Sequence, residues 1–125
     1  MRTKLKANVI ISNDTDGKNV LFGYDDTLSQ ETIDTYTRCV SGKFSVASST
    51  TYTLPFGDLS SVKGIYVKGD AAYDFSVNGG AAITSNIASS SGSSKVLLQA
   101  DLSSFSVTNN GSAALTGIWV AWGEL

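Results

Sequence analysis

The sequence predicts an all-β protein, an antiparallel sandwich or barrel of about eight or nine short strands with little or no helix. Three observations lead to this prediction. Apolar and polar residues alternate over short stretches along most of the chain, as they do in strands with one buried face. Turn-forming residues recur about every 8–12 positions. No stretch keeps the 3.6-residue apolar period of an amphipathic helix.

The first half of the chain contains strands separated by polar turns. Residues 5–12, 20–22 and 33–40 are expected strands, and the sequence between the first two, NDTDGKN, is an expected turn. Residues 24–31 have no clear period and form either a loop or a single helical turn capped by Thr27 with Gln30. Alternating apolar residues then continue the strand pattern: Phe44, Val46, Tyr52 and Leu54, ahead of Pro55.

The second half has the clearer pattern. Within residues 72–77, Tyr73, Phe75 and Val77 are expected to pack inward. Asn78-Gly79 then supplies two residues that tolerate positive φ, which predicts a tight hairpin turn. Asn109-Asn110-Gly111 marks another turn, and residues 85–95 form a polar loop. The expected strands of this half are 62–68, 72–77, 96–98, 105–107 and 115–122.

The composition is that of a folded, weakly charged protein. The chain has 125 residues, 42% hydrophobic and 16% charged, so we expect one β-sandwich domain spanning 1–125 with its own core. A net charge of −2 lacks the basic field of a nucleic-acid-binding protein. No apolar run approaches the roughly 20 residues of a membrane helix, and residues 1–23 lack the apolar core of a signal peptide. We expect neither a nucleic-acid nor a membrane partner.

The residue types also argue against an enzyme. The absence of histidine removes the commonest general base and zinc ligand. Cys39 is the single cysteine, so no disulfide forms within the chain, and we expect a small buried strand residue in a reducing compartment. The segment Asp14-Thr15-Asp16-Gly17 fits a turn better than a calcium loop. We expect no metal and no cofactor.

Carboxylates leave one enzymatic alternative open. A glycosidase needs two carboxyl groups across a cleft, roughly 5–9.5 Å apart, and a small sandwich with short loops offers little material for a cleft. A carboxylate-dependent hydrolase is therefore a remote alternative. Its candidate residues are Asp25, Asp26, Glu31 and Asp34.

The last expected strand is the feature that points to a partner. Its odd-numbered residues, Leu115 to Ala121, lie on one face, and its even-numbered residues, Thr116 to Trp122, lie on the other. Both faces are apolar, whereas a sandwich strand should be polar on its solvent side. Leu97 is out of phase in the same way. Because monomers rarely leave wide apolar patches in water, we expect another subunit to cover the second face.

Candidates for this interface combine apolar strand residues with a basic N-terminal arm that would reach an acidic neighbour. Two alternatives stay open. Trp122 would pack under the N-terminal strand, or Tyr66 and Trp122 would form an aromatic platform for a sugar ring. The interface candidates are Ile10, Tyr66, Ile118, Val120, Trp122, Arg2, Lys4 and Lys6.

Several segments together carry a family resemblance: LKANVIIS near the N-terminus, SSVKGIYVKGD, the hairpin VNGG, the turn SVTNNGS and the final strand LTGIWVAWG. Spread over nearly the whole chain, they resemble small virion proteins of tailed bacteriophages, in particular decoration (cement) proteins. The resemblance implies an antiparallel jelly-roll-like β-sandwich of about eight strands. It also implies a homo-oligomer, often a trimer, that binds a capsid or tail surface and has no catalytic residue.

The residues and the resemblance together favour one function. We expect a non-enzymatic virion structural protein that forms a homotrimer, contacts the major capsid protein or another virion protein, and stabilises the head shell. Such a protein is assembled in the host cytoplasm and located in the virion. The first alternative is a carbohydrate- or receptor-binding module of a fibre or tail, and the remote one is the carboxylate-dependent hydrolase.

Overall fold

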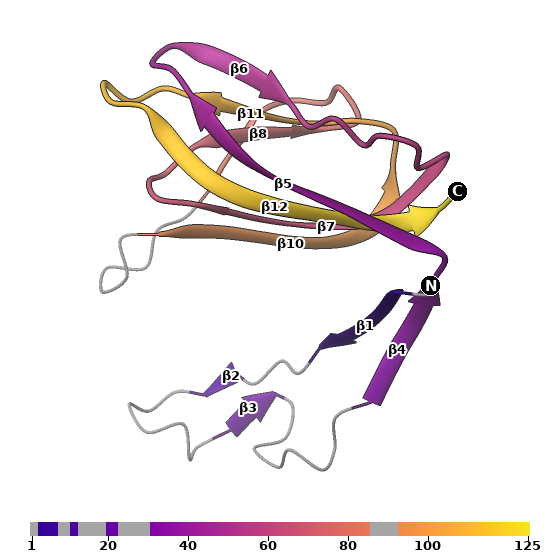
Figure 1. The fold of residues 1–125 in the computed structure, drawn as a ribbon. Helices are drawn as coiled ribbons and strands as arrows, with labels where there is room; N and C mark the ends of the chain where they lie inside the picture. The colour runs from indigo at the N-terminus through magenta and orange to yellow at the C-terminus, as the bar shows by residue number, and fades with distance from the viewer. Residues whose placement is uncertain (1–2, 8–10, 13–19, 23–30, 86–92) are drawn as a thin grey trace. The chain divides into compact units, whose positions relative to one another are not determined.

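The chain divides into two compact units, Met1–Tyr36 and Thr37–Leu125. The computed structural model describes residues 3–7, 11–12, 20–22, 31–85 and 93–125, and side chains are described from Tyr36 onward within these ranges. The two four-stranded sheets described below lie within Thr37–Leu125 (Figure 1), and the single domain expected over residues 1–125 stays a prediction.

The described residues of the first unit form two antiparallel strand pairs. β1 (Thr3–Ala7) pairs with β4 (Glu31–Tyr36). β2 (Ile11–Ser12) pairs with β3 (Val20–Phe22), so the strand expected over 20–22 is confirmed. The strand expected over 33–40 is interrupted, because β4 ends at Tyr36 and the next strand begins at Arg38. The expected loop or helical turn over 24–31 lies almost entirely outside the described residues.

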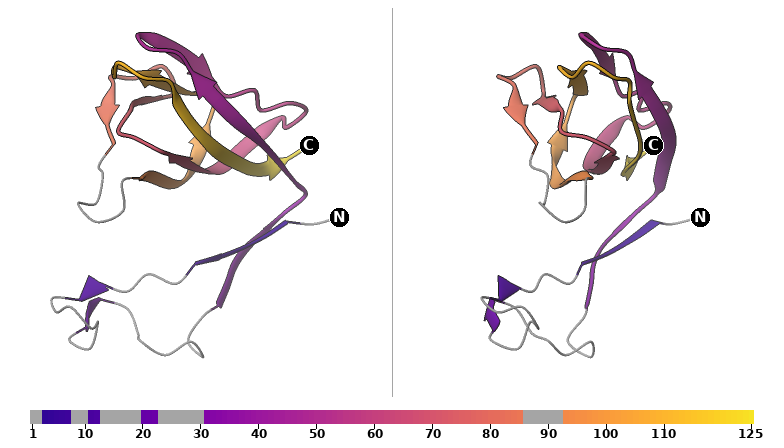
Figure 2. Two further views of the ribbon diagram at one scale, coloured as in Figure 1. Left: turned by 60° about the vertical axis from the view of Figure 1, so that its left-hand side comes forward. Right: turned by 90° about the vertical axis from the view of Figure 1, so that its left-hand side faces the viewer.

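The second unit is a sandwich of two four-stranded antiparallel sheets, which face each other in Figures 1 and 2. The prediction of an all-β sandwich is confirmed, and the described residues contain no helix. In spatial order, the first sheet consists of β10 (Ser94–Leu102), β7 (Ser61–Gly69), β12 (Leu115–Glu124) and β5 (Arg38–Val46). The second sheet consists of β6 (Thr50–Thr53), β11 (Phe105–Asn109), β8 (Asp74–Val77) and β9 (Ile83–Thr84).

The chain changes sheets at almost every connection. Only the hairpin from β8 to β9 stays within one sheet. As a result, the strands nearest the two ends of this unit pair with each other, and each following pair lies closer to its middle in the sequence. The first strand of the sandwich pairs with the last, β5 with β12, and then β6 pairs with β11, β7 with β10, and β8 with β9.

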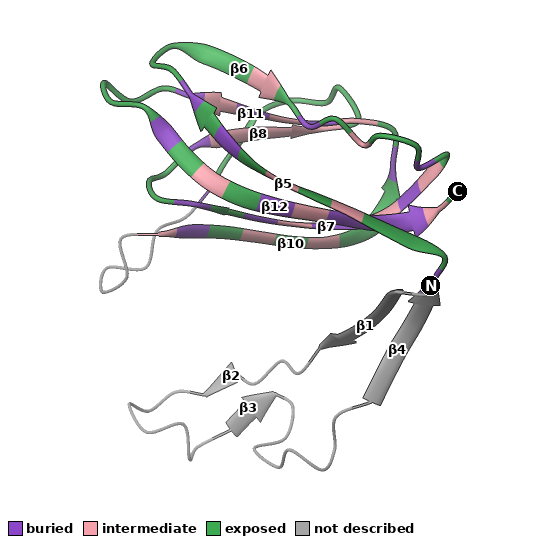
Figure 3. Cartoon of the chain, viewed as in Figure 1, coloured by how far each residue is buried: buried purple, intermediate pink, exposed green. Residues whose placement is uncertain are grey.

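The core fills the space between the two sheets, because alternate residues of each strand point inward. Burial alternates along β11 and along most of β12, as the coloured bands in Figure 3 show. Ile65, Phe105 and Val107 are completely buried, and each such side chain contributes roughly 1.5–3 kcal/mol through burial. Phe75 and Phe105 stack with ring centroids 5.5 Å apart. As predicted, Tyr73 is buried, whereas Phe75 is half-buried.

The predicted Asn78-Gly79 turn is confirmed. Asn78 has a φ of 55° and Gly79 a φ of 73°, and the Gly80 N–H donates to the Val77 carbonyl at 2.9 Å. Positive φ at both central residues matches the right-handed twist of the strands. The Asn78 side chain also fastens this turn to the next one, since its Oδ1 accepts from the N–H groups of Ser103 and Ser104.

Candidate protein-docking face

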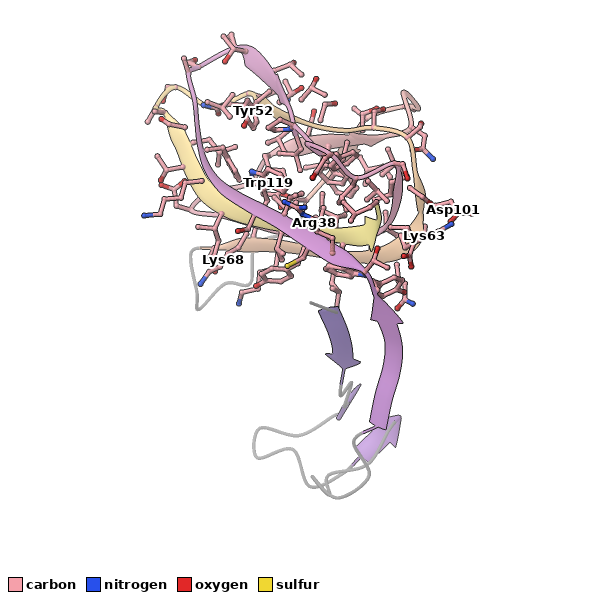
Figure 4. All side chains as sticks on the ribbon, turned by 45° about the vertical axis from the view of Figure 1, so that its right-hand side comes forward. Arg38, Tyr52, Lys63, Lys68, Asp101 and Trp119 are labelled. Carbon is pink, nitrogen blue, oxygen red and sulfur yellow. The ribbon has the colours of Figure 1, made fainter. Side chains whose placement is uncertain are left out.

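The register of the first sheet determines which side chains point away from the core. Ile65 and Val67 of β7 and Ala121 of β12 have no exposed surface. Their neighbours along each strand therefore point to the opposite side. We call that side, made by the outward residues of β10, β7, β12 and β5, the outer face. In Figure 4, Lys68 projects from this side, whereas Trp119 lies between the sheets.

Cross-strand pairing arranges the central outward residues in three rows that run across the four strands in the order β10, β7, β12, β5. Outside these rows, Thr116 and Ser45 are opposite each other at one end of the face, and Glu124 lies at the other end. The lysine row is Lys95, Lys68, Ile118 and Lys43. The apolar row is Leu97, Tyr66, Val120 and Ser41. The indole row is Gln99, Gly64, Trp122 and Cys39. Residues in one row are neighbours about 4.8 Å apart from strand to strand, so each row forms a continuous strip.

The outer face is apolar where water should favour polar residues. Leu97 is 58% exposed and Ile118 is 48% exposed, and they are among the few large apolar side chains of the described residues with this much solvent contact. Tyr66 and Val120 lie between them and are half-buried. The prediction that apolar residues of the last strand face outward is therefore confirmed for Ile118 and Val120. Contiguous apolar surface of this kind is typical of a protein-binding site.

The second sheet provides an internal comparison. Its outward residues carry hydroxyl or carboxylate groups throughout, and cross-strand hydrogen bonds join several of them. Thr51 and Thr108 share a hydrogen bond of 2.8 Å, and the Thr84 hydroxyl donates to Asp74 at 2.9 Å. The second sheet thus has a polar solvent side, whereas the outer face exposes Leu97 and Ile118 among its polar residues. These outward residues are Thr51, Thr53, Asp74, Ser76, Thr84, Ser106 and Thr108.

Trp122 belongs to the outer face by register but is only 4% exposed. Its indole lies against Gly64, the partner residue on β7, where any Cβ atom would overlap the ring. Beyond this pair the register shifts between Trp122 and Gly123, because Gly123 is opposite Val62 and β7 bulges at Lys63. The indole N–H groups of Trp119 and Trp122 have no acceptor among the described residues, so ring packing holds both side chains.

The lysine row contains no acidic residue. Lys43, Lys68 and Lys95 are exposed. In the described part of the chain, ion pairs join Arg38 to Asp58 and Lys63 to Asp101, and none involves the three lysines of this row. At the margin of the face, Asp70 accepts two hydrogen bonds from Thr116, at 3.0 Å from its N–H and 2.8 Å from its hydroxyl. The face therefore presents three positive charges beside an apolar strip.

Ile118 separates two surface hollows on the outer face. One hollow of about 410 Å³ is lined by Lys68, Asp70, Thr116 and Ile118, among others. The other, of about 400 Å³, lies towards β5 and includes Lys43, Tyr66, Ile118 and Val120 in its lining. Each hollow has the volume to accept side chains of a partner, with a lysine at its rim.

Several predicted residues fall outside the described part of the chain. Ile10 and Arg2 are not described, and Lys4 and Lys6 belong to β1, where the structure describes the strand but no side chains. The hydrolase candidates Asp25 and Asp26 likewise lie outside the described residues, as does the Asp14–Gly17 turn; Glu31 and Asp34 lie in β4 without described side chains.

One prediction about the site is wrong. Cys39 is exposed, not buried, because it points outward from β5, an edge strand of the first sheet. The proposed aromatic sugar platform is also weakened. Tyr66 and Trp122 do share the outer face, but Trp122 has almost no exposed ring surface on which a sugar could stack.

The described residues contain no group of three or more His, Cys, Asp or Glu side chains placed to hold a metal ion. The same residues include no helix with the length and hydropathy needed to cross a membrane.

Among the described residues, Tyr73 has a clearly shifted pKa. Burial raises this pKa to about 12, and a hydrogen bond with Ser94 opposes the increase.

The lysine row is the feature that the sequence did not predict. Each lysine occupies a solvent-facing position next to a core residue, which is the ordinary place for lysine in a strand. Only the strand order brings Lys43, Lys68 and Lys95 into one strip, since they are more than 20 residues apart along the chain.

No protein-family model matches the chain, and neither the curated proteins nor the solved structures yield a match.

Proposed function

We propose that this protein is a non-enzymatic virion structural protein, a capsid decoration protein that self-associates and stabilises the head shell. The observation that carries the proposal is the apolar outer face, on which Leu97 and Ile118 are about half exposed. Leaving this surface in water is unfavourable, and covering it with a neighbouring subunit removes that cost. Many such contacts over a shell would add stability by mass action.

The strand pairing supports a jelly roll as the finer description of the sandwich. Pairs β5·β12, β6·β11, β7·β10 and β8·β9 are what results when one long hairpin is wrapped into two four-stranded sheets. This topology agrees with the family that the sequence resembles, the small decoration proteins of tailed bacteriophages. A trimer with the major capsid protein as the second partner is the arrangement that this resemblance favours.

Electron microscopy of purified virions that carry this protein tests the role directly. A decoration protein gives additional density repeated over the shell, and particles without it release their contents at a lower temperature. Density confined to the tail would instead place the protein in a fibre or tail module. Virions whose heads show no density for the protein and no change in stability on its removal would contradict the proposal.

A further inference from the structure

The lysines of the lysine row repel one another. Lys95 and Lys68 are directly opposite each other on neighbouring strands, an arrangement that is unfavourable for like charges. Lys43 follows on the other side of Ile118. The lysine row itself contains no aspartate or glutamate. The one carboxylate on the outward side of β12 is Glu124, which lies at the other end of that strand and accepts a hydrogen bond from Thr37. A partner that brings carboxylates to this strip would remove the repulsion while it covers the apolar row.

The same face of a second copy does not meet this requirement. In a two-fold symmetric contact the same residues lie on both sides of the interface. Such a contact would bury two sets of three lysines against, at most, Glu124 from each outward side of β12, and uncompensated charges are costly to bury. The occupant must therefore come from a different surface, which makes the contact heterologous.

The carboxylates of the sandwich already have partners. Asp58 pairs with Arg38, and Asp101 pairs with Lys63. Asp74 accepts from the Asn110 side chain at 2.7 Å as well as from Thr84, Asp70 accepts twice from Thr116, and Glu124 accepts from the Thr37 hydroxyl at 2.7 Å. These groups are scattered singly over the sandwich, and none forms a strip that matches three lysines.

Residues 13–34 have the opposite composition, and we call them the acidic segment. It contains six carboxylates and one basic residue, Lys18, so its formal charge is −6 + 1 = −5. Apolar residues are interspersed with the acidic ones, among them Leu21, Phe22 and Leu28. Such a segment offers both carboxylates for the lysine row and apolar side chains for the hollows beside Ile118. The six carboxylates are Asp14, Asp16, Asp25, Asp26, Glu31 and Asp34.

We infer that the lysine row of one copy binds the acidic segment of a second copy. The inference rests on the self-association proposed above and adds the identity of the two surfaces that meet. A heterologous contact of this kind repeats from copy to copy and closes into a ring when the rotation allows, as a trimer requires. Because exposed ion pairs are screened by salt, the association weakens as ionic strength rises.

Charge reversal in the full-length chain tests the pairing. The face variant carries Lys43→Glu, Lys68→Glu and Lys95→Glu, and the segment variant carries Asp14→Lys, Asp25→Lys and Asp26→Lys. Sedimentation velocity at low salt gives the association constant of each protein alone and of an equimolar mixture. The charge swap Lys63→Asp/Asp101→Lys is the control, because it reverses an ion pair outside the lysine row and keeps the net charge. Circular dichroism checks that every variant is folded.

We expect each variant alone to associate at least about tenfold more weakly than the wild type, since the loss of several ion pairs is compounded by repulsion. The mixture restores association, because the reversed face meets the reversed segment. A face variant that associates as the wild type does, or a mixture that stays as weak as its components, overturns the inference and leaves self-association standing. A wild-type protein that does not associate at all overturns both.

Discussion

Gly64 and Trp122 form a close cross-strand pair in which the indole ring covers the glycine backbone. The pair lies in the indole row of the outer face, where Trp122 is only 4% exposed and Gly64 leaves room for one side of the ring. A side chain at position 64 and the ring cannot occupy the same space, so the two residues depend on each other.

Gly64→Ala should therefore destabilise the protein. The added methyl group must displace the Trp122 ring, and overpacking of this kind costs about 1–3 kcal/mol. Urea unfolding followed by circular dichroism measures the loss. Ser45→Ala is the control, because Ser45 is exposed on the same sheet and its substitution should change the free energy of unfolding by less than about 0.5 kcal/mol. Equal stabilities of the wild type and Gly64→Ala would show that the indole does not need the space above Gly64.

Asn78 is expected to stabilise the fold in two separable ways. Its positive φ disfavours most residues, and its side chain both accepts from Ser103 and Ser104 and donates to the Asp101 carbonyl at 3.1 Å. Asn78→Gly keeps the backbone conformation and loses only these bonds, at a cost of about 1 kcal/mol. Asn78→Ala adds backbone strain of about 1 kcal/mol more. Thermal or urea unfolding should therefore rank the wild type above Asn78→Gly, and Asn78→Gly above Asn78→Ala; a reversal of the two variants would contradict this account of the turn.

The raised pKa of Tyr73 predicts that the protein loses stability in alkaline solution. Burial raises its pKa from 10 to about 12 in the folded protein, and its hydroxyl donates to the Val67 carbonyl at 3.3 Å. Because the folded state disfavours the phenolate, this contribution to stability is complete below pH 10 and is lost as the pH rises from 10 through 12. The total change is on the order of 2 kcal/mol.

Urea unfolding at pH 9 and above measures this decline. Tyr73→Phe has no phenol to ionise at this position, so its stability should fall less steeply between pH 10 and 12, although it starts lower because a buried hydrogen bond is missing. Tyr52→Phe is the matched control, since Tyr52 is only half-buried. Parallel pH profiles for Tyr73→Phe and the wild type would exclude Tyr73 as the source of the alkaline sensitivity.

The labelling rate of Cys39 measures how accessible the indole row of the outer face is to solvent. Since it is exposed, a thiol reagent should label it in the native protein without unfolding. If copies of the chain cover the outer face, labelling should slow as the protein concentration increases. The variant Ile118→Ser, which weakens the apolar contact, should remove this protection. Labelling that requires denaturant would contradict the exposed position of Cys39. A labelling rate that does not depend on protein concentration in either protein would contradict the covering of the outer face by a second copy.

Local sequence chemistry predicted the parts of the fold that depend on neighbouring residues. Alternation predicted β7 and β12 to within two residues at each end, because every second side chain of a strand must enter the core. Asn78-Gly79 predicted a turn because both residues tolerate positive φ. These signals are contained within a few consecutive positions, so no knowledge of the partner strands was needed.

Properties set by strand order could not be predicted in this way. The exposure of Cys39 depends on β5 being an edge strand, and the position of the Trp122 ring depends on a glycine opposite it on β7. The break after Tyr36 separates two units where the strand pattern continues without interruption. The lysine row likewise exists only because pairing aligns Lys95, Lys68 and Lys43, three residues from separate strands.

The most direct test of the account is the mass of the native chain in solution as a function of concentration. Sedimentation equilibrium of the wild type should show growth from one chain towards a small closed oligomer, and the double variant Leu97→Ser/Ile118→Ser should remain a single folded chain, because both side chains are exposed and their loss costs the monomer little. A wild-type protein that keeps the mass of one chain at the highest concentration would show that the outer face needs no second copy.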